Sequence, residues 1–357
     1  VTYTPIRWLD ISGEKYRDIM ISEGTPELYN GHPTTVMLDD NKTIFCTWSK
    51  GPGGPAAFLA RSEDGGLTWR KLPVPDDWLK TENCPSIYKL TDRQGKQRLF
   101  VFAAKPGMSR TYSEDNGKTW SPVKSLDKPC VMAFTSILRL KNGNYLGLYH
   151  GYRNSGGDKD LPGAPQRVWG SLSEDGGLTW KESFPLPDRP DKSPCEPCLI
   201  RSPDGNELMV LMRDESRTGS SLVMYSRDEG NTWSAIEETV PYLTGDRHVA
   251  KYTPDGRLVV TFRDRMAGSP FYGHFVAWVG KYEDIVNKRE GQYRIKLLHS
   301  YAGWDCGYPG LEILPDGTII ATTYIKYREG NDRHSIVSAR FKLEDLNFSF
   351  YSVFDFP

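Results

Sequence analysis

The chain of 357 residues lacks the features that mark membrane-spanning and nucleic-acid-binding proteins. Its apolar runs fall well short of the roughly 20 residues that cross a bilayer. The formal net charge is −1, so no overall field attracts nucleic acid or an anionic membrane, and neither partner is expected. Recognition of a charged ligand must therefore depend on local groups. Val1 to Pro5 do not have the pattern of a signal peptide.

Cysteine is also scarce. Six cysteines are spread along the chain, too sparsely for a disulfide scaffold. Cys195 and Cys198 form a C-x-x-C pair, but no second ligand pair follows at a spacing typical of zinc sites. Residues three apart in an extended strand also point to opposite faces. We expect buried free thiols, with no metal site and no cofactor.

Glycine, proline and aromatic residues are plentiful, with 34 Gly, 25 Pro and 12% aromatic residues, as is typical of a turn-rich all-β protein. The pattern S-x-D-x-G-x-T-W occurs four times. It begins at Ser62, Ser113, Ser173 and Ser226, at intervals of 51, 60 and 53 residues. The Asp can bond the amides of its own turn, and the Gly can take a positive φ. These are tight hairpin turns, and their regular spacing indicates a repeat architecture.

Each turn ends the third of about four expected strands in a unit, and six such units follow one another. The fifth and sixth units lose the S-x-D-x-G-x-T-W turn but keep a first hairpin, at Pro254 to Gly256 and Pro315 to Gly317. Six units predict a six-bladed β-propeller of four-stranded antiparallel blades, formed by residues 1–357 as one domain. The last unit is one strand short, so we expect Tyr16 to Ile21 to complete it and close the ring.

The first strand of each blade runs along the axis of a propeller, so its first residue faces one mouth of the central channel. Counting nine residues back from the Gly or Asn of the following turn gives His32, Phe134, Glu196, Arg247 and Tyr308. In the second unit, Cys84 or Pro85 is expected there. Packing alone would favour similar residues at equivalent positions, whereas these include a base, a carboxylate, a guanidinium and a phenol.

The far end of each hairpin returns to the same mouth. It adds further polar residues, among them His150, Arg153, Arg213, Arg263 and Arg265. A lone arginine in such a place more often closes a salt bridge between blades. Four arginines that converge with an acid and a phenol favour a site for an anionic ligand.

The S-x-D-x-G-x-T-W turns resemble the Asp boxes of the sialidase superfamily, and the hairpins resemble sialidase blades over essentially the whole chain. The resemblance implies that the boxes are structural and lie opposite the active site. It also implies a Tyr nucleophile, matched by Tyr308 in Gly307-Tyr308-Pro309, and a Glu partner, matched by Glu196 with Arg213 following it. A Glu beside a phenol can act as its base, and a phenol attacks an anionic sugar with less repulsion than a carboxylate. The same resemblance favours a secreted or periplasmic location, while the oligomeric state is not indicated.

Three positions depart from the sialidase pattern. Gly31-His32-Pro33 stands where sialidases have Arg-Ile-Pro, so the first arginine of the carboxylate-binding triad is missing. The loop at 50–56 lacks the Asp general acid, and the third arginine of the triad is absent from 274–282. Arg247, Arg263 and Arg265 are close enough in sequence to substitute for it.

The proton donor is therefore sought elsewhere. His32 is the first candidate, because an imidazole titrates near neutral pH and its position is on the axis. Other candidates are His150 and two acids of the Gly- and Pro-rich insertion at 154–166, Asp158 and Asp160. The sequence is equally compatible with two non-catalytic alternatives. In these, His32 is a packed, hydrogen-bonded histidine, and the insertion is an ordinary surface loop.

The sequence thus predicts a carbohydrate-active enzyme, an exo-acting glycoside hydrolase on an anionic or unusual terminal sugar. Its catalytic residues would be Tyr308, Glu196 and His32. Its substrate-binding residues would be Arg213, Arg247, Arg263, Arg265, His150, Arg153, Trp304 and Asp305, the last two on the loop before Tyr308. Two alternatives stay open: a glycan-binding propeller without catalysis, and a polysaccharide lyase on uronate-containing glycans that uses Tyr308 and a histidine as base and acid.

Overall fold

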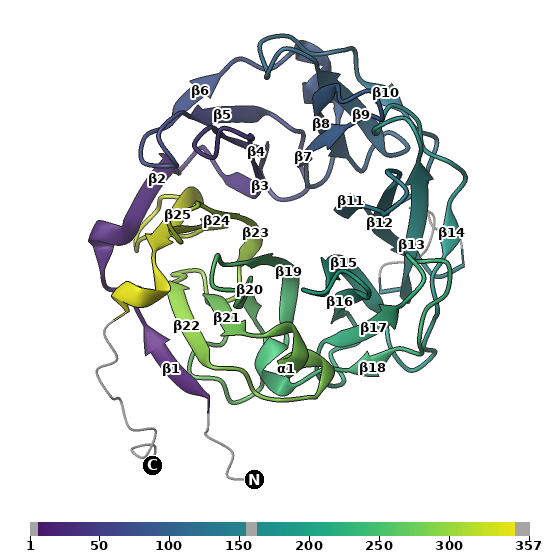
Figure 1. The fold of residues 1–357 in the computed structure, drawn as a ribbon. Coiled ribbons are helices and arrows are strands. Elements are labelled where there is room, and N and C mark those ends of the chain that lie inside the picture. Colours follow the sequence, from purple (N-terminus) through teal and green to yellow (C-terminus); the bar gives the residue numbers. More distant parts are fainter. Residues whose placement is uncertain (1–5, 155–162, 347–357) are drawn as a thin grey trace.

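The strands of the protein form a ring of six sheets around a central axis (Figure 1). This computed structural model describes residues 6–154 and 163–346. In each sheet the strands follow one another outwards from the axis in chain order, except that two strands from the start of the chain form the outermost strands of the last two sheets. The prediction of an all-β, six-bladed β-propeller is confirmed.

Blades one to three are formed by residues 30–185. Blade one contains β3 (Asn30–Met37), β4 (Ile44–Lys50), β5 (Phe58–Ser62) and β6 (Arg70–Leu72). Blade two contains β7 (Ser86–Thr91), β8 (Gln97–Ala103), β9 (Ser109–Ser113) and β10 (Lys124–Ser125). Blade three contains β11 (Met132–Arg139), β12 (Tyr145–Tyr152), β13 (Gln166–Ser173) and β14 (Phe184–Pro185).

The other three blades follow, and the last two also take strands from the start of the chain. Blade four contains β15 (Pro194–Arg201), β16 (Leu208–Asp214), β17 (Leu222–Ser226) and β18 (Glu237–Glu238). Blade five contains β19 (Gly245–Tyr252), β20 (Leu258–Asp264), β21 (Phe275–Gly280), β22 (Tyr293–Leu298) and β1 (Arg7–Asp10). Blade six contains β23 (Cys306–Ile313), β24 (Ile319–Ile325), β25 (Ser335–Phe341) and β2 (Asp18–Ser22).

The helices of the described residues are short and lie in the segments between strands or, for the last one, after β25. The α-helix α1 (Tyr282–Val286) precedes β22. Single 3₁₀ turns occur at Lys15–Arg17, Asp76–Lys80, Pro241–Leu243 and Leu343–Asp345. Within the described ranges no helix has the length and apolarity needed to span a lipid bilayer.

The N-terminal segment ties two blades together. β2 pairs antiparallel with β25, with Asp18 opposite Ala339, and so supplies the outer strand of blade six. β1, which the repeat pattern did not suggest, pairs parallel with β22, with Arg7 opposite Tyr293. Blade five therefore has five strands, and the chain passes from the edge of blade five to the edge of blade six before blade one begins (Figure 1).

The four box turns join the third and fourth strands of blades one to four. In the first, Asp64 Oδ1 accepts hydrogen bonds from the backbone N–H of Leu67 (3.0 Å) and of Thr68 (2.9 Å). The Trp69 indole N–H closes the turn on the Gly66 carbonyl at 3.1 Å. Each box follows a strand that runs away from the mouth where β3 begins, so the boxes lie at the opposite end of the axis.

The boxes also join neighbouring blades. Gly177 of the third box has a φ of 94°, and a Cβ there would lie 2.5 Å from Leu90 Cδ1 of blade two. Only glycine meets both conditions, the left-handed backbone and the close approach. This position therefore couples a turn to the interface between two blades.

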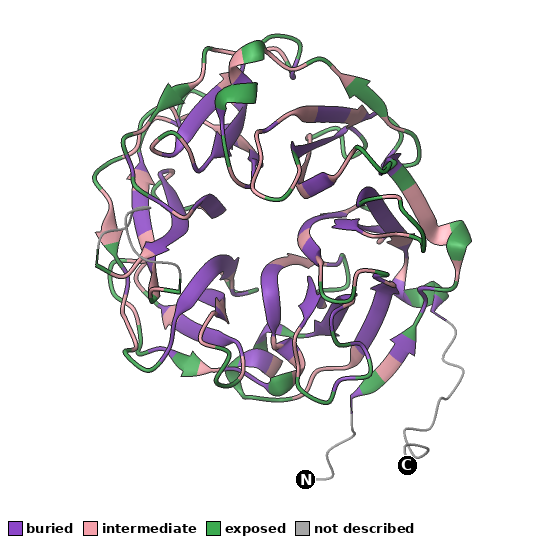
Figure 2. Cartoon of the chain, turned by 180° about the vertical axis from the view of Figure 1, so that it is seen from behind, coloured by how far each residue is buried: buried purple, intermediate pink, exposed green. Residues whose placement is uncertain are grey.

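The hydrophobic core is divided among the six interfaces between adjacent blades. Figure 2 shows buried residues concentrated on the strands and exposed residues on the outer loops. Between blades six and one, Trp48 packs with Ile336 and donates its indole N–H to Asn30 at 2.8 Å. A fully buried aromatic side chain contributes about 1.5–3 kcal/mol. All six cysteines are free thiols in this buried interior.

Candidate active site

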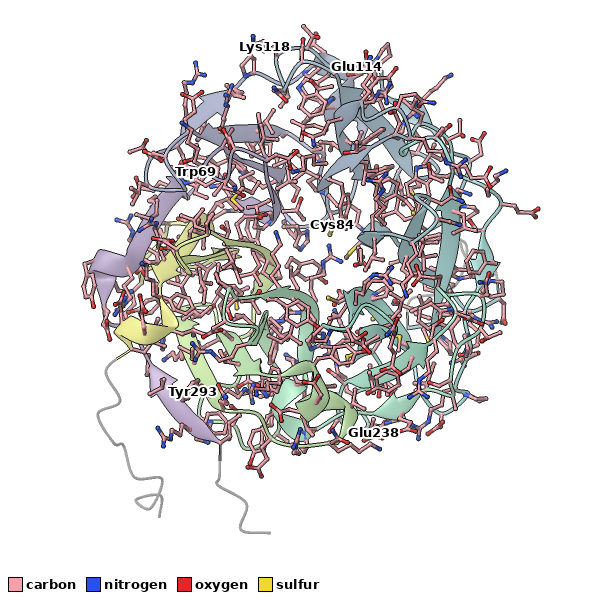
Figure 3. The ribbon with its side chains drawn as sticks, viewed as in Figure 1. Trp69, Cys84, Glu114, Lys118, Glu238 and Tyr293 are labelled. Atoms are coloured by element: carbon pink, nitrogen blue, oxygen red, sulfur yellow. The ribbon has the colours of Figure 1, made fainter. Side chains whose placement is uncertain are left out.

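The residues that face the mouth sit on strained backbone. Five non-glycine residues at equivalent places in five blades have a left-handed φ: His32 (22°), Cys84 (50°), Glu196 (52°), Arg247 (54°) and Tyr308 (51°). In four of these blades the first hairpin shifts register at this residue. Such backbone costs about 1–3 kcal/mol for each residue and clusters at functional sites. In Figure 3, Cys84 lies near the axis, whereas Glu114 and Lys118 lie at the outer edge.

Tyr308 and Glu196 contact each other across the mouth. The Tyr308 hydroxyl donates a hydrogen bond to Glu196 Oε1 at 2.6 Å. Arg213 Nη1 donates to the same carboxylate oxygen at 2.9 Å and lies 3.4 Å from the Tyr308 oxygen. The other carboxylate oxygen, Oε2, accepts the backbone N–H of Arg247 at 2.8 Å. Glu196 is thus held on both oxygens, with one of them aimed at the phenol.

The charges around this pair keep the carboxylate ionised and the phenol neutral. Burial acts to raise the pKa of Glu196, but the Arg213 guanidinium, together with His150 and the hydrogen bond from Tyr308, brings the pKa below its usual value. Burial, and then the negative charge of Glu196, hold the pKa of Tyr308 well above its usual value. The shared proton therefore rests on Tyr308, and Glu196 is placed to accept it.

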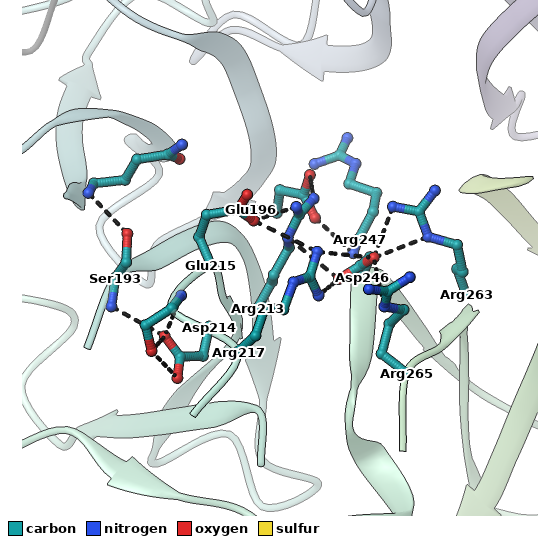
Figure 4. A network of polar contacts seen from close by, with 12 residues as sticks. Ser193, Glu196, Arg213, Asp214, Glu215, Arg217, Asp246, Arg247, Arg263 and Arg265 are labelled. Atoms are coloured by element: carbon teal, nitrogen blue, oxygen red, sulfur yellow. Dashed lines mark hydrogen bonds and ion pairs between the residues drawn. The ribbon is translucent and has the colours of Figure 1, made fainter. Parts of the chain in front are cut away.

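A single buried carboxylate gathers four arginines beside this pair (Figure 4). Asp246 Oδ2 accepts Arg263 Nε at 2.8 Å and Nη2 at 2.7 Å. Asp246 Oδ1 pairs with Arg213 Nε at 3.2 Å and also binds Arg217. Arg265 Nε is 3.9 Å from Asp246 Oδ2. Burial acts to raise the pKa of Asp246, but Arg263 and Arg213 lower it strongly, so the group carries its charge.

The outer side of this arginine group reaches solvent. The side chains of Arg217 and Arg265 are 34% and 21% exposed, whereas Arg263 is buried. Two exposed aromatic rings flank them: Arg263 stacks over Trp304 at 5.5 Å, and Arg265 stacks over Tyr272 at 5.1 Å. The mouth thus presents positive charge beside aromatic faces, a combination that suits an anionic sugar.

His32 lies against the ring of Tyr308. The two ring centroids are 4.4 Å apart, and the Tyr324 ring lies 5.0 Å from His32 on another side. Burial lowers the pKa of His32 to about 4. The imidazole is therefore neutral at neutral pH, a state that favours accepting a proton over the donor role expected from the sequence.

Asp305 is engaged on the blade-six side of the site. Its carboxylate accepts the hydroxyls of Tyr29 at 2.8 Å and Tyr324 at 3.0 Å, and lies 3.1 Å from His334 Nε2. The neighbouring Trp304 is 59% exposed, so the two residues face different surroundings. The contacts of Asp305 support the aromatic wall around Tyr308, whereas its predicted contact with sugar hydroxyls stays a prediction.

The remaining predicted residues divide into two groups. His150 accepts the backbone N–H of Glu196 on Nδ1 at 3.2 Å and so belongs to the site. Arg153 pairs with Asp188 at 2.8 Å and donates to carbonyls of residues 189–192, which lie outside this contact network. Asp158 and Asp160 fall outside the described residues.

The sequence reasoning missed Asp246, Glu215 and Arg217. Glu215 pairs with Arg213 and, at 3.5 Å, with Arg217. A signal was present, since Arg217 and Glu215 lie within four residues of Arg213 and Asp246 directly precedes Arg247. None of the described residues forms a group of three or more His, Cys, Asp or Glu side chains that could hold a metal ion.

The central channel continues beneath the site. A cavity of about 390 Å³ is lined by the first strands of the blades, including Thr34, Tyr88, Thr135, Arg247 and Glu312. Arg247 points into it and donates to the Thr135 carbonyl at 3.2 Å. Arg247 thus contributes its backbone to Glu196 and its side chain to the channel.

Six blades with box turns at one end and a polar mouth at the other make this a sialidase-like propeller. Residues 17–156 and 163–265 match the family described as BNR repeat-like domain, and the chain belongs to that family. Vacuolar protein sorting/targeting protein PEP1 of Saccharomyces cerevisiae is 27% identical over 197 residues, a match that covers 50% of this chain and 12% of PEP1. The chain therefore spans only a small part of that relative.

Solved structures with the same fold include glycoside hydrolases. A protein of unknown function from Dyadobacter fermentans has a TM-score of 0.71 at 17% identity, covering 90% of this chain and 97% of that one. The alpha-L-arabinanase of Penicillium chrysogenum, complexed with arabinobiose, has a TM-score of 0.63 at 16% identity, covering 92% and 98%. The NanB sialidase of Streptococcus pneumoniae, as its K499G mutant, has a TM-score of 0.60 at 12% identity, covering 92% and 70%. At these identities the likeness concerns the fold.

Proposed function

We propose that the protein is an exo-acting glycoside hydrolase that removes an anionic or otherwise unusual terminal sugar from a glycan. The observation that carries the proposal is the 2.6 Å hydrogen bond from the Tyr308 hydroxyl to an ionised Glu196. It provides a nucleophile and its base at the mouth of the channel, on a fold that sialidases and an arabinanase also have.

In the proposed first step, the Tyr308 oxygen attacks the anomeric carbon of the sugar while Glu196 Oε1 takes the phenolic proton. The bond from the anomeric carbon to the leaving oxygen breaks, and its electron pair stays with that oxygen. Arg213, within 3.4 Å of the Tyr308 oxygen, stabilises negative charge that develops there. A phenol that starts neutral avoids repulsion with an anionic sugar.

The arginine group would bind the anionic group of the sugar. Arg217 and Arg265 offer the solvent-facing guanidinium groups, and Arg213 and Arg263 stand behind them. Trp304 and Tyr272 would contact the apolar face of the ring. Because two arginines of the sialidase pattern are absent from their usual positions, the sugar need not be a sialic acid.

The test is release of 4-methylumbelliferone from a panel of glycosides that includes the sialic-acid and uronic-acid derivatives. The Tyr308→Phe variant should fold normally and lose at least about 10³-fold in kcat. Tyr282→Phe is the matched control, because Tyr282 also donates to a glutamate, Glu207 at 3.0 Å, but away from the mouth. Retained turnover in Tyr308→Phe would reject the nucleophile, and binding without turnover of any glycoside would favour a glycan-binding propeller.

One observation favours a second candidate, a lyase on uronate-containing glycans. A neutral His32, with its ring centroid 4.4 Å from that of a neutral Tyr308, could remove the proton α to a uronate carboxylate while the phenol protonates the leaving oxygen. The arginines would neutralise the carboxylate. An unsaturated product that absorbs in the ultraviolet would identify this reaction, whereas hydrolysis gives none.

A further inference from the structure

Three side chains form a continuous line that ends at Tyr308. Asn83 donates its side-chain N–H to the Val131 carbonyl at 2.6 Å, which turns its carbonyl oxygen Oδ1 toward Cys84. The Cys84 sulfur lies 3.0 Å from that oxygen and 3.1 Å from His32 Nδ1. Cys84 takes a left-handed φ of 50°, so the backbone is held in an unfavourable region where the sulfur meets both groups.

The count of hydrogens fixes the direction of these two bonds. A thiol has one hydrogen, and Asn83 Oδ1 can only accept. If the thiol donated to His32, no hydrogen would lie between the sulfur and Oδ1, although they are 3.0 Å apart. If the thiol donates to Oδ1, the sulfur can accept the N–H of His32 Nδ1, and each short contact holds a hydrogen. The second arrangement satisfies both contacts.

The same arrangement leaves the other ring nitrogen of His32 without a proton. A neutral imidazole carries one N–H, so a proton on Nδ1 makes Nε2 an acceptor. Within the described ranges Nε2 makes no hydrogen bond, and His32 as a whole is partly exposed. The ring that carries it lies 4.4 Å from that of Tyr308, at the partly exposed mouth.

We infer that His32 is a general base, which uses Nε2 to activate the water that releases the sugar from Tyr308, and that Asn83 and Cys84 set its tautomer. The inference rests on the proposed hydrolase. In the step, the water oxygen bonds to the anomeric carbon while its proton passes to Nε2. The bond from that carbon to the Tyr308 oxygen breaks with its electron pair on oxygen, which takes back the proton held by Glu196. His32 then releases its proton to solvent.

The burial of His32 and the burial of Cys84 both support this assignment. Burial lowers the pKa of His32 to about 4, so Nε2 is free to accept a proton at neutral pH. It also raises the pKa of the Cys84 thiol, so the sulfur keeps the hydrogen that it donates to Asn83. Cys84 and Asn83 are positioning residues, since they act on the water only through His32.

The tautomer can be tested without any substrate. In protein labelled with ¹⁵N-histidine, one of only six histidine signals belongs to His32, and the His32→Gln variant identifies it. At pH 7 we expect a neutral ring protonated on Nδ1. Cys84→Ser, whose hydroxyl can donate and accept in the same places, should keep this state, and Cys84→Ala should lose it. A ring protonated on Nε2, or a charged ring, would overturn the inference whatever the reaction proves to be.

The catalytic role is tested with the 4-methylumbelliferyl glycoside that the wild-type protein hydrolyses fastest, because its leaving group needs no acid. His32→Ala should show a rapid first release of fluorophore followed by turnover slowed about 10²-fold or more. Azide needs no base, so it should restore turnover and yield the glycosyl azide. Cys84→Ala should respond to azide in the same way and Cys84→Ser should resemble the wild type. His32→Gln replaces His32→Ala if the latter does not fold.

Failure of the proposed hydrolase and failure of the base assignment would give different results. A wild-type protein that hydrolyses no glycoside would overturn the hydrolase and, with it, this role of His32. Wild-type turnover that depends on Tyr308, together with a slow first release and no azide response in the His32 variant, would overturn only the base assignment.

Discussion

Tyr308 donates a 2.6 Å hydrogen bond to Glu196 across 112 positions of sequence, and the two residues have matching left-handed φ values of 51° and 52°. Each lies at the mouth end of the first strand of its blade, where the register with the second strand shifts. The same local distortion in two blades thus turns two side chains toward one point on the axis. The repeated fold makes this contact possible, and the identity of the two side chains gives it a chemical use.

Glu196→Gln should separate binding from catalysis. The amide keeps the shape of the side chain but cannot take the phenolic proton, so kcat should fall by about 10²–10⁴-fold while KM changes little. Glu207→Gln, in the Tyr282 pair outside the mouth, is the control and should leave kcat unchanged. A comparable loss in both variants would indicate a general loss of structure instead.

Asp246→Asn should weaken both the fold and anion binding. Loss of the carboxylate leaves the buried Arg263 without an ion-pair partner, whereas Arg213 keeps Glu196, and such an uncompensated charge costs about 3–5 kcal/mol of unfolding free energy. Asp264→Asn is the matched control, because it breaks a fully buried pair with Arg294 in the same blade. Urea unfolding should show a loss in both variants, whereas only Asp246→Asn should also raise KM for an anionic substrate.

The sequence was most informative where structure is local. The box turns depend on bonds within a few residues, such as those of Asp64 to Leu67 and Thr68, so the pattern of letters is enough to identify them. Counting back from each hairpin turn likewise led to Glu196 and Tyr308, because a hairpin keeps its length from blade to blade. These repeated distances made the architecture and the mouth predictable.

Contacts between segments that are distant in the sequence were harder to predict. Arg213 and Asp246 come from neighbouring blades, and no spacing in the sequence states that four arginines share one carboxylate. The parallel pairing of β1 with β22 also has no repeat signal, since β1 lies outside the repeated units. The approach of Cys84 to His32 depends on the arrangement of blades one and two around the axis.

Stability should fall as the pH is lowered from about 6.5 to about 4. Burial lowers the pKa of His32, His150 and His248 to about 4, against about 6.5 in an unfolded chain. In this window the unfolded chain binds more protons than the folded one, so acid favours unfolding by up to about 1.4 kcal/mol per pH unit for each histidine. Urea midpoints at pH 7, 6 and 5 measure this, and His248→Asn should reduce the slope. Equal midpoints would contradict it.

The acid side of the activity profile should report His32. Arg213, His150 and the Tyr308 hydrogen bond together hold the pKa of Glu196 below its usual value despite burial, and burial lowers the pKa of His32 to about 4, so protonation of His32 is expected to limit the rate. We expect kcat to be level through pH 6 and to fall toward pH 4. An acid limb centred near pH 6.5 would contradict the neutral, buried state of this histidine.

Trp304→Ala should affect binding without affecting the fold. The side chain is 59% exposed and stacks with Arg263, so unfolding free energy should change by less than about 0.5 kcal/mol while KM rises several-fold. Tyr16→Ala, which removes an exposed ring near β2 and away from the mouth, is the control and should leave KM unchanged. An unchanged KM in Trp304→Ala would remove this residue from the binding surface.

The most direct test of the account is to trap the sugar on the protein. A 2-fluoro glycosyl fluoride of the sugar that the panel identifies should form a stable adduct, which peptide mass spectrometry can locate. We predict that the added mass lies on Tyr308 and that the Tyr308→Phe variant acquires none. An adduct on another residue, or turnover by the wild-type protein without any adduct, would contradict Tyr308 as the nucleophile.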